Sequence, residues 1–178
     1  MVVHPASLAL VQAAKQGDES AFELLLEPLL GQGYRLACAM LHDHHAAEDA
    51  VQEAAFKAWL KVSQLREGSE MRPWFLGIVA NQCRSARRSR WWSVVRTNEP
   101  EQARAPAEDA VLEGVELRRA LRSMDPAKRL VLVLHWYLDL PLEEIAAVAG
   151  TTVHAAESRL LRATQELKRR MEVSGGQP

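Results

Sequence analysis

Apolar residues recur along this chain at intervals of three or four positions, which is the spacing of one face of an α-helix. In the first 41 residues the repeating positions are Leu8, Val11, Ala14, Phe22, Leu25, Leu26, Leu29, Tyr34, Ala37, Cys38 and Leu41. Asp18 or Ser20 is a suitable start signal for the second helix, whereas Pro28 would kink that helix unless a break falls there. No alternating run of β-branched residues is long enough for a sheet. The pattern therefore predicts an all-α fold.

The next helical pattern, His42 to Trp59, has an apolar side and an acidic side. Asp43 is placed to cap the helix, and the core-facing positions are Val51, Ala55, Ala58 and Trp59. Asp49, Gln52 and Glu53 share the opposite face, where Glu53 alone has a basic residue, Lys57, at helical pairing distance. This face is either a solvated helix surface or an acidic docking face for a basic partner.

Histidines cluster at the start of this pattern, at His42, His44 and His45. Adjacent residues diverge and no fourth ligand stands at helical spacing, so we expect a turn and no metal site. No Gly-rich phosphate loop or serine elbow occurs, and His135 within an apolar helix is expected to be a packed core residue. The sequence therefore indicates neither a cofactor nor an enzyme.

A basic helix is predicted from Met71 to Trp92, over "MRPWFLGIVANQCRSARRSRWW". Its expected inward positions are Trp74, Ile78, Val79, Cys83 and Ala86, and its outward or C-terminal arginines are Arg84, Arg87, Arg88 and Arg90. Such a helix can hold phosphates while Trp91 and Trp92 stack on bases, or it can be a basic helix end whose tryptophans fold onto the next segment. Asn81 has poor propensity in mid-helix, so it faces solvent or has a partner, which is weak support for a base contact.

The last third of the chain predicts four helices, of which the final two are joined by a tight turn at Gly150. The first two are separated at Asp125-Pro126, and the second has its apolar positions at Leu130, Val131, Leu134 and Tyr137. Pro141 pre-sets the first turn of the third helix, and Thr152 can cap the fourth. In that fourth helix the stripe Val153, Ala156, Leu160, Ala163 and Leu167 is expected to face inward, and His154, Ala155, Glu157, Ser158, Arg159 and Arg162 outward. Four helices of this kind place the last one in the major groove of DNA.

The formal net charge of −1 conceals a segregation of charge along the chain. All charged residues from 71 to 98 are positive, whereas six acidic residues and a single arginine lie between 99 and 116. Prolines and solvated charges without apolar periodicity predict a linker from Thr97 to Ala107. The chain of 178 residues, of which 48% are hydrophobic, is therefore expected to form two small domains, at 1–96 and 108–173, on either side of a linker at 97–107.

The distribution of apolar residues and cysteines also constrains location. No apolar run reaches about 18 residues, and the N-terminus lacks a charged head followed by an apolar core and a cleavage site. We expect a cytoplasmic protein without membrane insertion. Cys38 and Cys83 are far apart and form no CxxC pair, so both are expected to be small buried hydrophobic residues.

These motifs and their order resemble those of the extracytoplasmic-function (ECF) class of bacterial RNA polymerase sigma factors. The resemblance runs from about Gln16 to Arg170. "AEDAVQEAAFKAW" is similar to the core-binding helix of sigma region 2, and "RPWFLGIVANQCRSARR" to its promoter-melting and minus-ten helix. The segment from "MDPAKRLVLVLHWYL" through "ESRLLRA" is similar to region 4, the minus-35 domain. The helix-turn-helix alone is moderately specific, but together with the acidic and basic helices in this order it makes coincidence improbable.

The resemblance implies a role for each surface. Asp49, Gln52 and Glu53 would contact core RNA polymerase, where the family's acidic helix docks on a coiled coil of the largest subunit. The implied minus-ten contacts are Arg72, Trp74, Asn81, Arg84, Arg87 and Arg88, with a loop at about Gln64 to Arg72 that captures a flipped base. The implied minus-35 contacts are Thr152, His154, Glu157, Ser158, Arg159 and Arg162. Besides polymerase and promoter DNA, the family commonly has an anti-sigma factor as a partner. The acidic linker would run through the polymerase near its active-site and RNA-exit channels.

The chain departs from the family pattern at three positions. Glu157 stands where a basic residue is common and could accept a hydrogen bond from cytosine. Gly77 replaces a frequent arginine, and Pro141 stands where a Ser or Thr cap is usual.

Two other functions remain open from the sequence. A helix-turn-helix regulator acting without core polymerase would leave the Asp49 face unused, and an all-helical interaction adaptor would bind no DNA. Salt-sensitive promoter binding only in the presence of core polymerase distinguishes the sigma function from both.

Overall fold

The computed structural model describes residues 5–66, 68–97 and 112–175, and all of its regular structure within these ranges is helical. The chain divides into two compact units, Met1–Asn98 and Glu99–Pro178. Apart from Thr97, the linker predicted at 97–107 lies outside the described residues. Within the described part of the chain, no helix is sufficiently long and apolar to cross a membrane.

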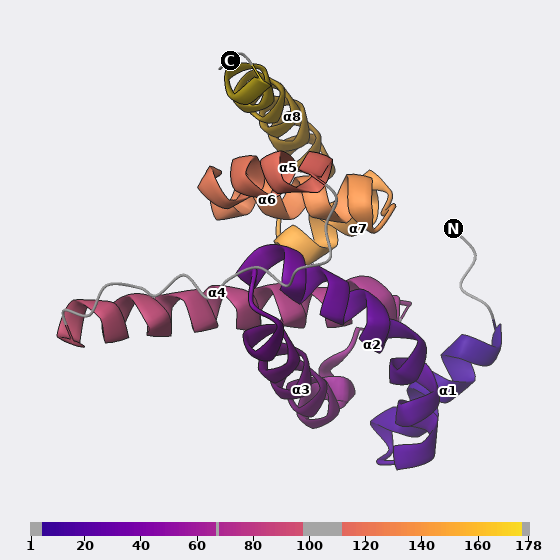
Figure 1. The fold of residues 1–178 in the computed structure, drawn as a ribbon. Coiled ribbons are helices and arrows are strands. Elements are labelled where there is room, and N and C mark those ends of the chain that lie inside the picture. Colours follow the sequence, from indigo (N-terminus) through magenta and orange to yellow (C-terminus); the bar gives the residue numbers. More distant parts are fainter. Residues whose placement is uncertain (1–4, 67, 98–111, 176–178) are drawn as a thin grey trace. The chain divides into compact units, whose positions relative to one another are not determined.

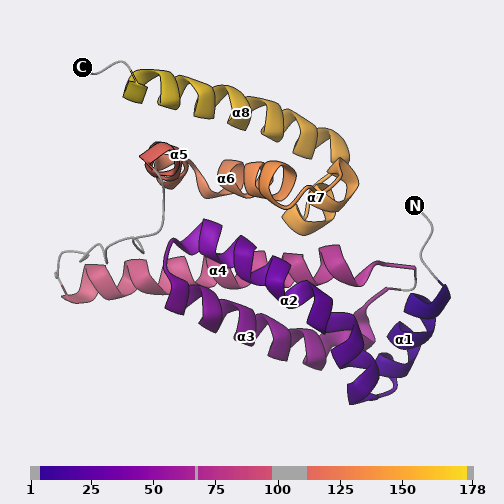
Figure 2. The ribbon, with the colours of Figure 1, turned by 45° about the vertical axis from the view of Figure 1, so that its right-hand side comes forward.

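The N-terminal unit is a bundle of three long helices with a short helix across one end (Figure 1). Its elements are α1 (Pro5–Lys15), α2 (Glu19–Leu41), α3 (His44–Lys61), the 3₁₀ turn η1 (Val62–Gln64) and α4 (Met71–Thr97). Helices α2, α3 and α4 all pack against one another, and α1 packs against α2. The C-terminal part of α4 projects beyond the other two long helices (Figure 2).

Helix α2 starts at the first of its two predicted signals. The carboxylate of Asp18 accepts a hydrogen bond of 3.0 Å from the backbone N–H of Ala21, so Asp18 and not Ser20 is the cap. The helix includes Pro28 without the break that the sequence allowed. It ends at His42, which adopts a left-handed conformation with φ of 57°.

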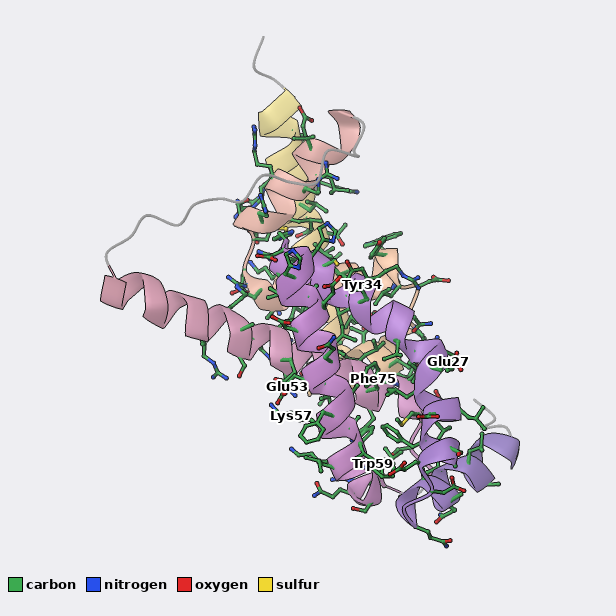
Figure 3. All side chains as sticks on the ribbon, turned by 60° about the horizontal axis from the view of Figure 1, so that its bottom comes forward. Glu27, Tyr34, Glu53, Lys57, Trp59 and Phe75 are labelled. Atoms are coloured by element: carbon green, nitrogen blue, oxygen red, sulfur yellow. The ribbon has the colours of Figure 1, made fainter. Side chains whose placement is uncertain are left out.

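Helix α4 buries a different face from the one expected. Val79 and Cys83 are fully buried as predicted, but Phe75 and Leu76 are too, whereas Trp74 and Ile78 remain partly exposed. The buried face turns because α4 contacts both α2 and α3, and Phe75 lies between these helices (Figure 3).

The core allows α2 and α4 to approach closely at Gly33. A Cβ atom there would lie 3.0 Å from Cε1 of Phe75 and 3.4 Å from Cγ2 of Val79. A methyl group at this position would make the Phe75 ring shift by a few tenths of an ångström, so packing and not a turn favours glycine here.

The C-terminal unit is built around its last helix. Its elements are α5 (Leu112–Ser123), α6 (Pro126–Leu132), the π-helical turn η2 (Val133–Tyr137), α7 (Leu142–Ala149) and α8 (Val153–Gly175). Helix α8 runs along α5, α6 and α7 (Figure 2). Asp125 caps α6 by accepting hydrogen bonds from the backbone N–H groups of Ala127 and Lys128, at the break that the sequence predicts.

The core of this unit contains a charged side chain. Arg129 is 2% exposed, and its guanidinium donates hydrogen bonds of 2.7, 2.8 and 3.2 Å to the carbonyls of Leu121, Arg122 and Met124. These carbonyls belong to the end of α5 and the residue that follows it, where helical partners are missing. Glu144, in the first turn of α7, is also 2% exposed.

The predicted second helix of this unit does not continue regularly to Tyr137. It widens into η2, where the N–H of Leu138 donates to the carbonyl of Val133 over 3.0 Å. Trp136 is 70% exposed and Tyr137 is 58% exposed, so Tyr137 does not share the burial of the other predicted apolar positions, Leu130, Val131 and Leu134. The extra residue in the turn rotates the aromatic side chains away from the core.

Candidate functional site

The acidic side of α3 is held outward by the way the helix packs. The carboxylate of Asp43 accepts a hydrogen bond of 3.0 Å from the N–H of Ala46, which fixes the start of the helix. The buried positions of α3 are Ala47, Ala50, Val51, Ala54 and Ala58. These small side chains let the helix lie close to α2 and α4, and Asp49, Gln52 and Glu53 are all exposed on the other side.

Two large apolar side chains extend this acidic surface. Phe56 and Leu60 are each 59% exposed, and they follow Gln52 at four-residue intervals along the same side of the helix. We define Asp49, Gln52, Glu53, Phe56 and Leu60 as the docking face of α3. Sequence reasoning missed Phe56 and Leu60, although their spacing from Gln52 was a signal that could have identified them. A charged surface with exposed aromatic and aliphatic groups is typical of a protein–protein contact.

Lys57 lies at the edge of the docking face, between α3 and α4. Its ammonium is 2.9 Å from the carboxylate of Glu53 and donates a hydrogen bond of 3.1 Å to the side-chain oxygen of Gln82 on α4. Figure 3 shows Glu53 and Lys57 next to each other on α3. The ion pair predicted from the spacing is present, but its bond to α4 could not be read from one helix.

The outer face of α4 carries most of the predicted minus-ten residues. Trp74, Asn81 and Arg88 are spaced seven residues apart, which places them on one side of the helix. Trp74 is partly buried, and Asn81 and Arg88 are exposed. Arg84 is exposed beside them and donates a hydrogen bond to the side-chain oxygen of Asn81. We define Trp74, Asn81, Arg84 and Arg88 as the Asn81 face of α4. The polar partner that a mid-helix asparagine requires is therefore this arginine.

Two other predicted minus-ten residues occupy different positions. Arg72 lies on the core-facing side of the first turn of α4 and is partly buried, so the structure does not bring it to the Asn81 face. Arg87 is exposed farther along α4, on the flank of that face. The helical rise between Arg72 and Arg88 is about 24 Å. Contacts at both ends of this set would therefore involve several nucleotides of a strand and not a single one. The structure does not describe the side chains of Arg90, Trp91 and Trp92. Glu67, in the predicted base-capturing loop, also lies outside the described residues.

Helices α7 and α8 form the predicted helix-turn-helix. Gly150 has φ of 63°, and the N–H of Thr151 donates to the carbonyl of Ala146 over 2.9 Å, which closes the end of α7. The hydroxyl of Thr152 then accepts a hydrogen bond of 3.2 Å from the N–H of Ala155 and starts α8. Thr152 is thus the cap that the sequence predicts, and its hydroxyl is used within the chain.

The first half of α8 presents the predicted minus-35 residues. His154, Glu157 and Arg162 are exposed, whereas Ser158 and Arg159 are partly buried. The guanidinium of Arg162 donates to the carbonyl of Ser158 over 3.1 Å. Val153, expected to face inward, is 41% exposed because it lies at the first residue of α8, before the helix enters the core at Ala156.

The second half of α8 attaches the helix to the rest of the unit. Glu166 is 2.6 Å from the ammonium of Lys128 on α6 and 2.7 Å from the guanidinium of Arg170. Hydrogen bonds from Lys128 and Arg170 hold the pKa of Glu166 below its ordinary value. Arg170 also donates over 2.8 Å to the hydroxyl of Ser123 at the end of α5. These contacts fix the direction in which the exposed first half of α8 points.

The histidines at the start of α3 make local contacts. Nδ1 of His44 is 3.0 Å from the hydroxyl of Tyr34 and 3.7 Å from Sγ of Cys38. Among the described residues, no group of three or more His, Cys, Asp or Glu side chains is arranged to hold a metal ion. Cys83 is fully buried, and burial raises the pKa of its thiol to about 12, but Cys38 is only partly buried.

A helix-turn-helix in one unit and an exposed, arginine-rich helix in the other are typical of a DNA-binding protein. Comparison with known families agrees: the Sigma-70 region 2 profile matches residues 25–93, and the Sigma-70, region 4 profile matches residues 114–167. The chain is 30% identical over 138 residues to the ECF RNA polymerase sigma factor EcfG of Rhodopseudomonas palustris, covering 74% of each protein. It is 24% identical over 184 residues to the RNA polymerase sigma-H factor of Pseudomonas aeruginosa, covering 92% of each.

A solved structure has the same fold. The sigma factor RpoE of Bartonella quintana, in complex with the anti-sigma factor NepR, matches with a TM-score of 0.71 and 26% identity over 85% of this chain and 97% of that one. This chain therefore belongs to the sigma-70 family of RNA polymerase sigma factors and is of the ECF type.

Proposed function

We propose that this chain binds core RNA polymerase, directs it to specific promoters and helps to melt the minus-ten element. The observation that carries the proposal is that one unit presents two separate exposed surfaces, the docking face on α3 and the Asn81 face on α4. A regulator that only binds duplex DNA needs the second unit alone. A sigma factor needs a surface for the polymerase and one for the opened strand.

The docking face of α3 is the proposed contact with core polymerase. Asp49 and Glu53 attract a basic partner, and Phe56 and Leu60 provide the apolar area that a stable contact buries. In the N-terminal unit, these acidic and apolar side chains lie together on one helix, α3. This favours a docking face over a merely solvated helix surface.

The Asn81 face of α4 is the proposed contact with the non-template strand of the minus-ten element. Moving a base out of the stack costs a few kcal/mol, which contacts to the base and to phosphates must offset. Arg84 and Arg88 supply cations beside Asn81, and Trp74 supplies an aromatic surface toward the start of the helix. Arg87 adds a phosphate contact on the flank, and Arg72 is proposed as a contact at the first turn of α4.

The first half of α8 is the proposed reader of the minus-35 element. Arg159 and Arg162 can bind guanine edges or phosphates, and Glu157 can accept a hydrogen bond from cytosine. His154 and Ser158 complete the surface, with Thr152 as the cap that positions its start. Because the carboxylate of Glu157 accepts hydrogen bonds, we expect this chain to prefer promoters with a hydrogen-bond-donating base at the position that Glu157 contacts.

An anti-sigma factor is a further proposed partner. The similar sigma factor of Bartonella quintana was solved with its anti-sigma factor bound. In this chain the docking face is exposed and partly apolar, so a protein that covers it would block access to polymerase. The sigma role requires no covalent chemistry from the chain itself.

The proposed function is tested by mixing the purified chain with bacterial core RNA polymerase and transcribing a pool of promoters by run-off. We expect a stable complex and transcripts that share upstream motifs at minus-ten and minus-35. DNA binding without polymerase binding would support the plain helix-turn-helix regulator instead. Binding to neither would support an interaction adaptor.

Replacing both Asp49 and Glu53 with alanine is expected to weaken binding to core polymerase by about tenfold or more, since two charges that steer and hold a basic partner are lost. Both side chains are exposed, so the thermal unfolding temperature should stay the same. Titration of labelled chain with core polymerase measures the affinity.

The matched control is replacement of Glu23 and Glu27 with alanine. These two acids are exposed on α2 at the same four-residue spacing, away from the docking face. The control has the same change in net charge and should retain its affinity. Equal losses in the two variants would mean that net charge alone determines binding.

Replacing Arg159 with alanine is expected to lower discrimination between promoters by about 1–3 kcal/mol if the guanidinium contacts a base. Competition between cognate and altered minus-35 sequences, with the chain bound to polymerase, measures this difference. Arg169, exposed in the second half of α8, is the control position. A uniform loss on all sequences would make Arg159 a phosphate contact, and no loss would remove it from the site.

A further inference from the structure

Lys57 joins the docking face of α3 to helix α4, at the residue next to Asn81. Its ammonium pairs with Glu53 of the docking face at 2.9 Å and donates to Gln82 of α4 at 3.1 Å. Gln82 is next to Asn81, which in turn accepts a hydrogen bond from Arg84. A single cation therefore connects the helix that faces polymerase to the helix that faces DNA.

The two partners of Lys57 differ in charge. Glu53 is a carboxylate that a basic group of a partner can also bind, whereas Gln82 is a neutral acceptor that stays in place on α4. The side chains of Lys57 and Glu53 are 39% and 51% exposed, and an ion pair in that environment is weak enough to exchange. A cation that docks on Glu53 competes with Lys57, and the ammonium then keeps its bond to Gln82.

We propose that Lys57 is a positioning residue that couples polymerase docking on α3 to strand capture by α4. Before docking, Lys57 is shared between Glu53 and Gln82. After docking, the ammonium of Lys57 stays hydrogen-bonded to Gln82 on α4. There it attracts the phosphates of the opened strand and keeps α4 in position relative to α3. This inference rests on the proposed function, because it assigns a partner to each of the two faces.

Thermodynamic linkage gives the coupling a measurable form. If polymerase strengthens strand binding through Lys57, then the opened strand strengthens polymerase binding by the same factor. Removing Lys57 removes this factor without removing either face. Core affinity measured without DNA should therefore stay the same while promoter opening becomes slower, in contrast to a loss of folding, which would weaken both.

The test uses four variants of the full chain with core polymerase and a promoter. Lys57→Met removes the cation, Gln82→Met removes its acceptor on α4, and Lys57→Arg keeps the charge. Lys61→Met is the matched control, because Lys61 is an exposed lysine one turn later on α3. The readouts are the dissociation constant for core polymerase, the rate of open-complex formation at saturating polymerase, and the thermal unfolding temperature.

We expect Lys57→Met and Gln82→Met to slow open-complex formation at saturating polymerase by about threefold to tenfold. Their core affinity should be unchanged within about twofold, or tighter for Lys57→Met because Glu53 is no longer neutralised. Lys57→Arg should restore the opening rate, and Lys61→Met should match the parental chain.

Three results would overturn the coupling. Parental opening rates in both methionine variants, an opening defect that follows a lower unfolding temperature, or no restoration by arginine would each contradict a positioning role for Lys57. Failure of the proposed function is distinguishable, because the parental chain would then not bind core polymerase at all.

Discussion

Replacing Arg129 with methionine is expected to lower the free energy of unfolding of the C-terminal unit by about 3–5 kcal/mol. The side chain is 2% exposed and its guanidinium serves three carbonyls at the end of α5. Methionine fills a similar volume but donates no hydrogen bond. The carbonyls of Leu121, Arg122 and Met124 would then lack the donor that closes the α5–α6 corner.

Chemical denaturation of the isolated chain measures this loss, with Arg119→Met as the control. Arg119 is exposed on α5, so the same loss of charge there should cost less than about 1 kcal/mol. Because the two units have separate cores, the Arg129 variant should keep a folded N-terminal unit and its affinity for core polymerase. It should lose recognition of the minus-35 element. Equal stability of the two variants would show that the buried guanidinium is not structural.

Local sequence signals predicted the helices well because each signal acts within one turn of the chain. Asp43 and Thr152 cap the helices that they were expected to cap, and Gly150 takes the left-handed conformation that ends α7. The recurrence of apolar residues every three or four positions likewise located α2, α3 and α8. Each of these features depends on neighbours within about four residues.

Features that depend on two helices could not be predicted from one periodicity. The buried face of α4 includes Phe75 because Gly33 of α2 leaves room for it, and neither residue alone indicates the other. No sequence pattern marks Arg129 as buried, yet the end of α5 and the residue after it bring three carbonyls to its guanidinium. In both cases tertiary packing outweighs the local pattern.

The candidate site shows the same division. The exposed positions of Asp49, Gln52 and Glu53 follow from helical spacing alone, whereas the bond from Lys57 to Gln82 joins residues 25 positions apart. Arg72 belongs to the predicted minus-ten residues by its place in the chain, and its nine-residue separation from Asn81 puts it on the other side of α4, where it is partly buried. Chain order fixes which helix carries a residue, and packing decides which face it occupies.

Replacing Phe75 with alanine is expected to destabilise the N-terminal unit by about 3–5 kcal/mol. Phe75 is fully buried, and the glycine that it packs against has no side chain with which to fill the space left behind. The cavity would lie between α2 and α4, so the Asn81 face would lose its support. Chemical denaturation should show this loss while the C-terminal unit unfolds as in the parental chain.

Phe56→Ala is the matched control, because it makes the same change on α3 at a side chain that is 59% exposed. It should cost less than about 1 kcal/mol of stability and yet weaken binding to core polymerase, since Phe56 belongs to the docking face. A comparison of the two variants therefore distinguishes a phenylalanine that supports the fold from one that contacts a partner. If Phe75→Ala were no more destabilising than Phe56→Ala, the close packing of α2 on α4 would not be what holds the DNA-facing helix in place.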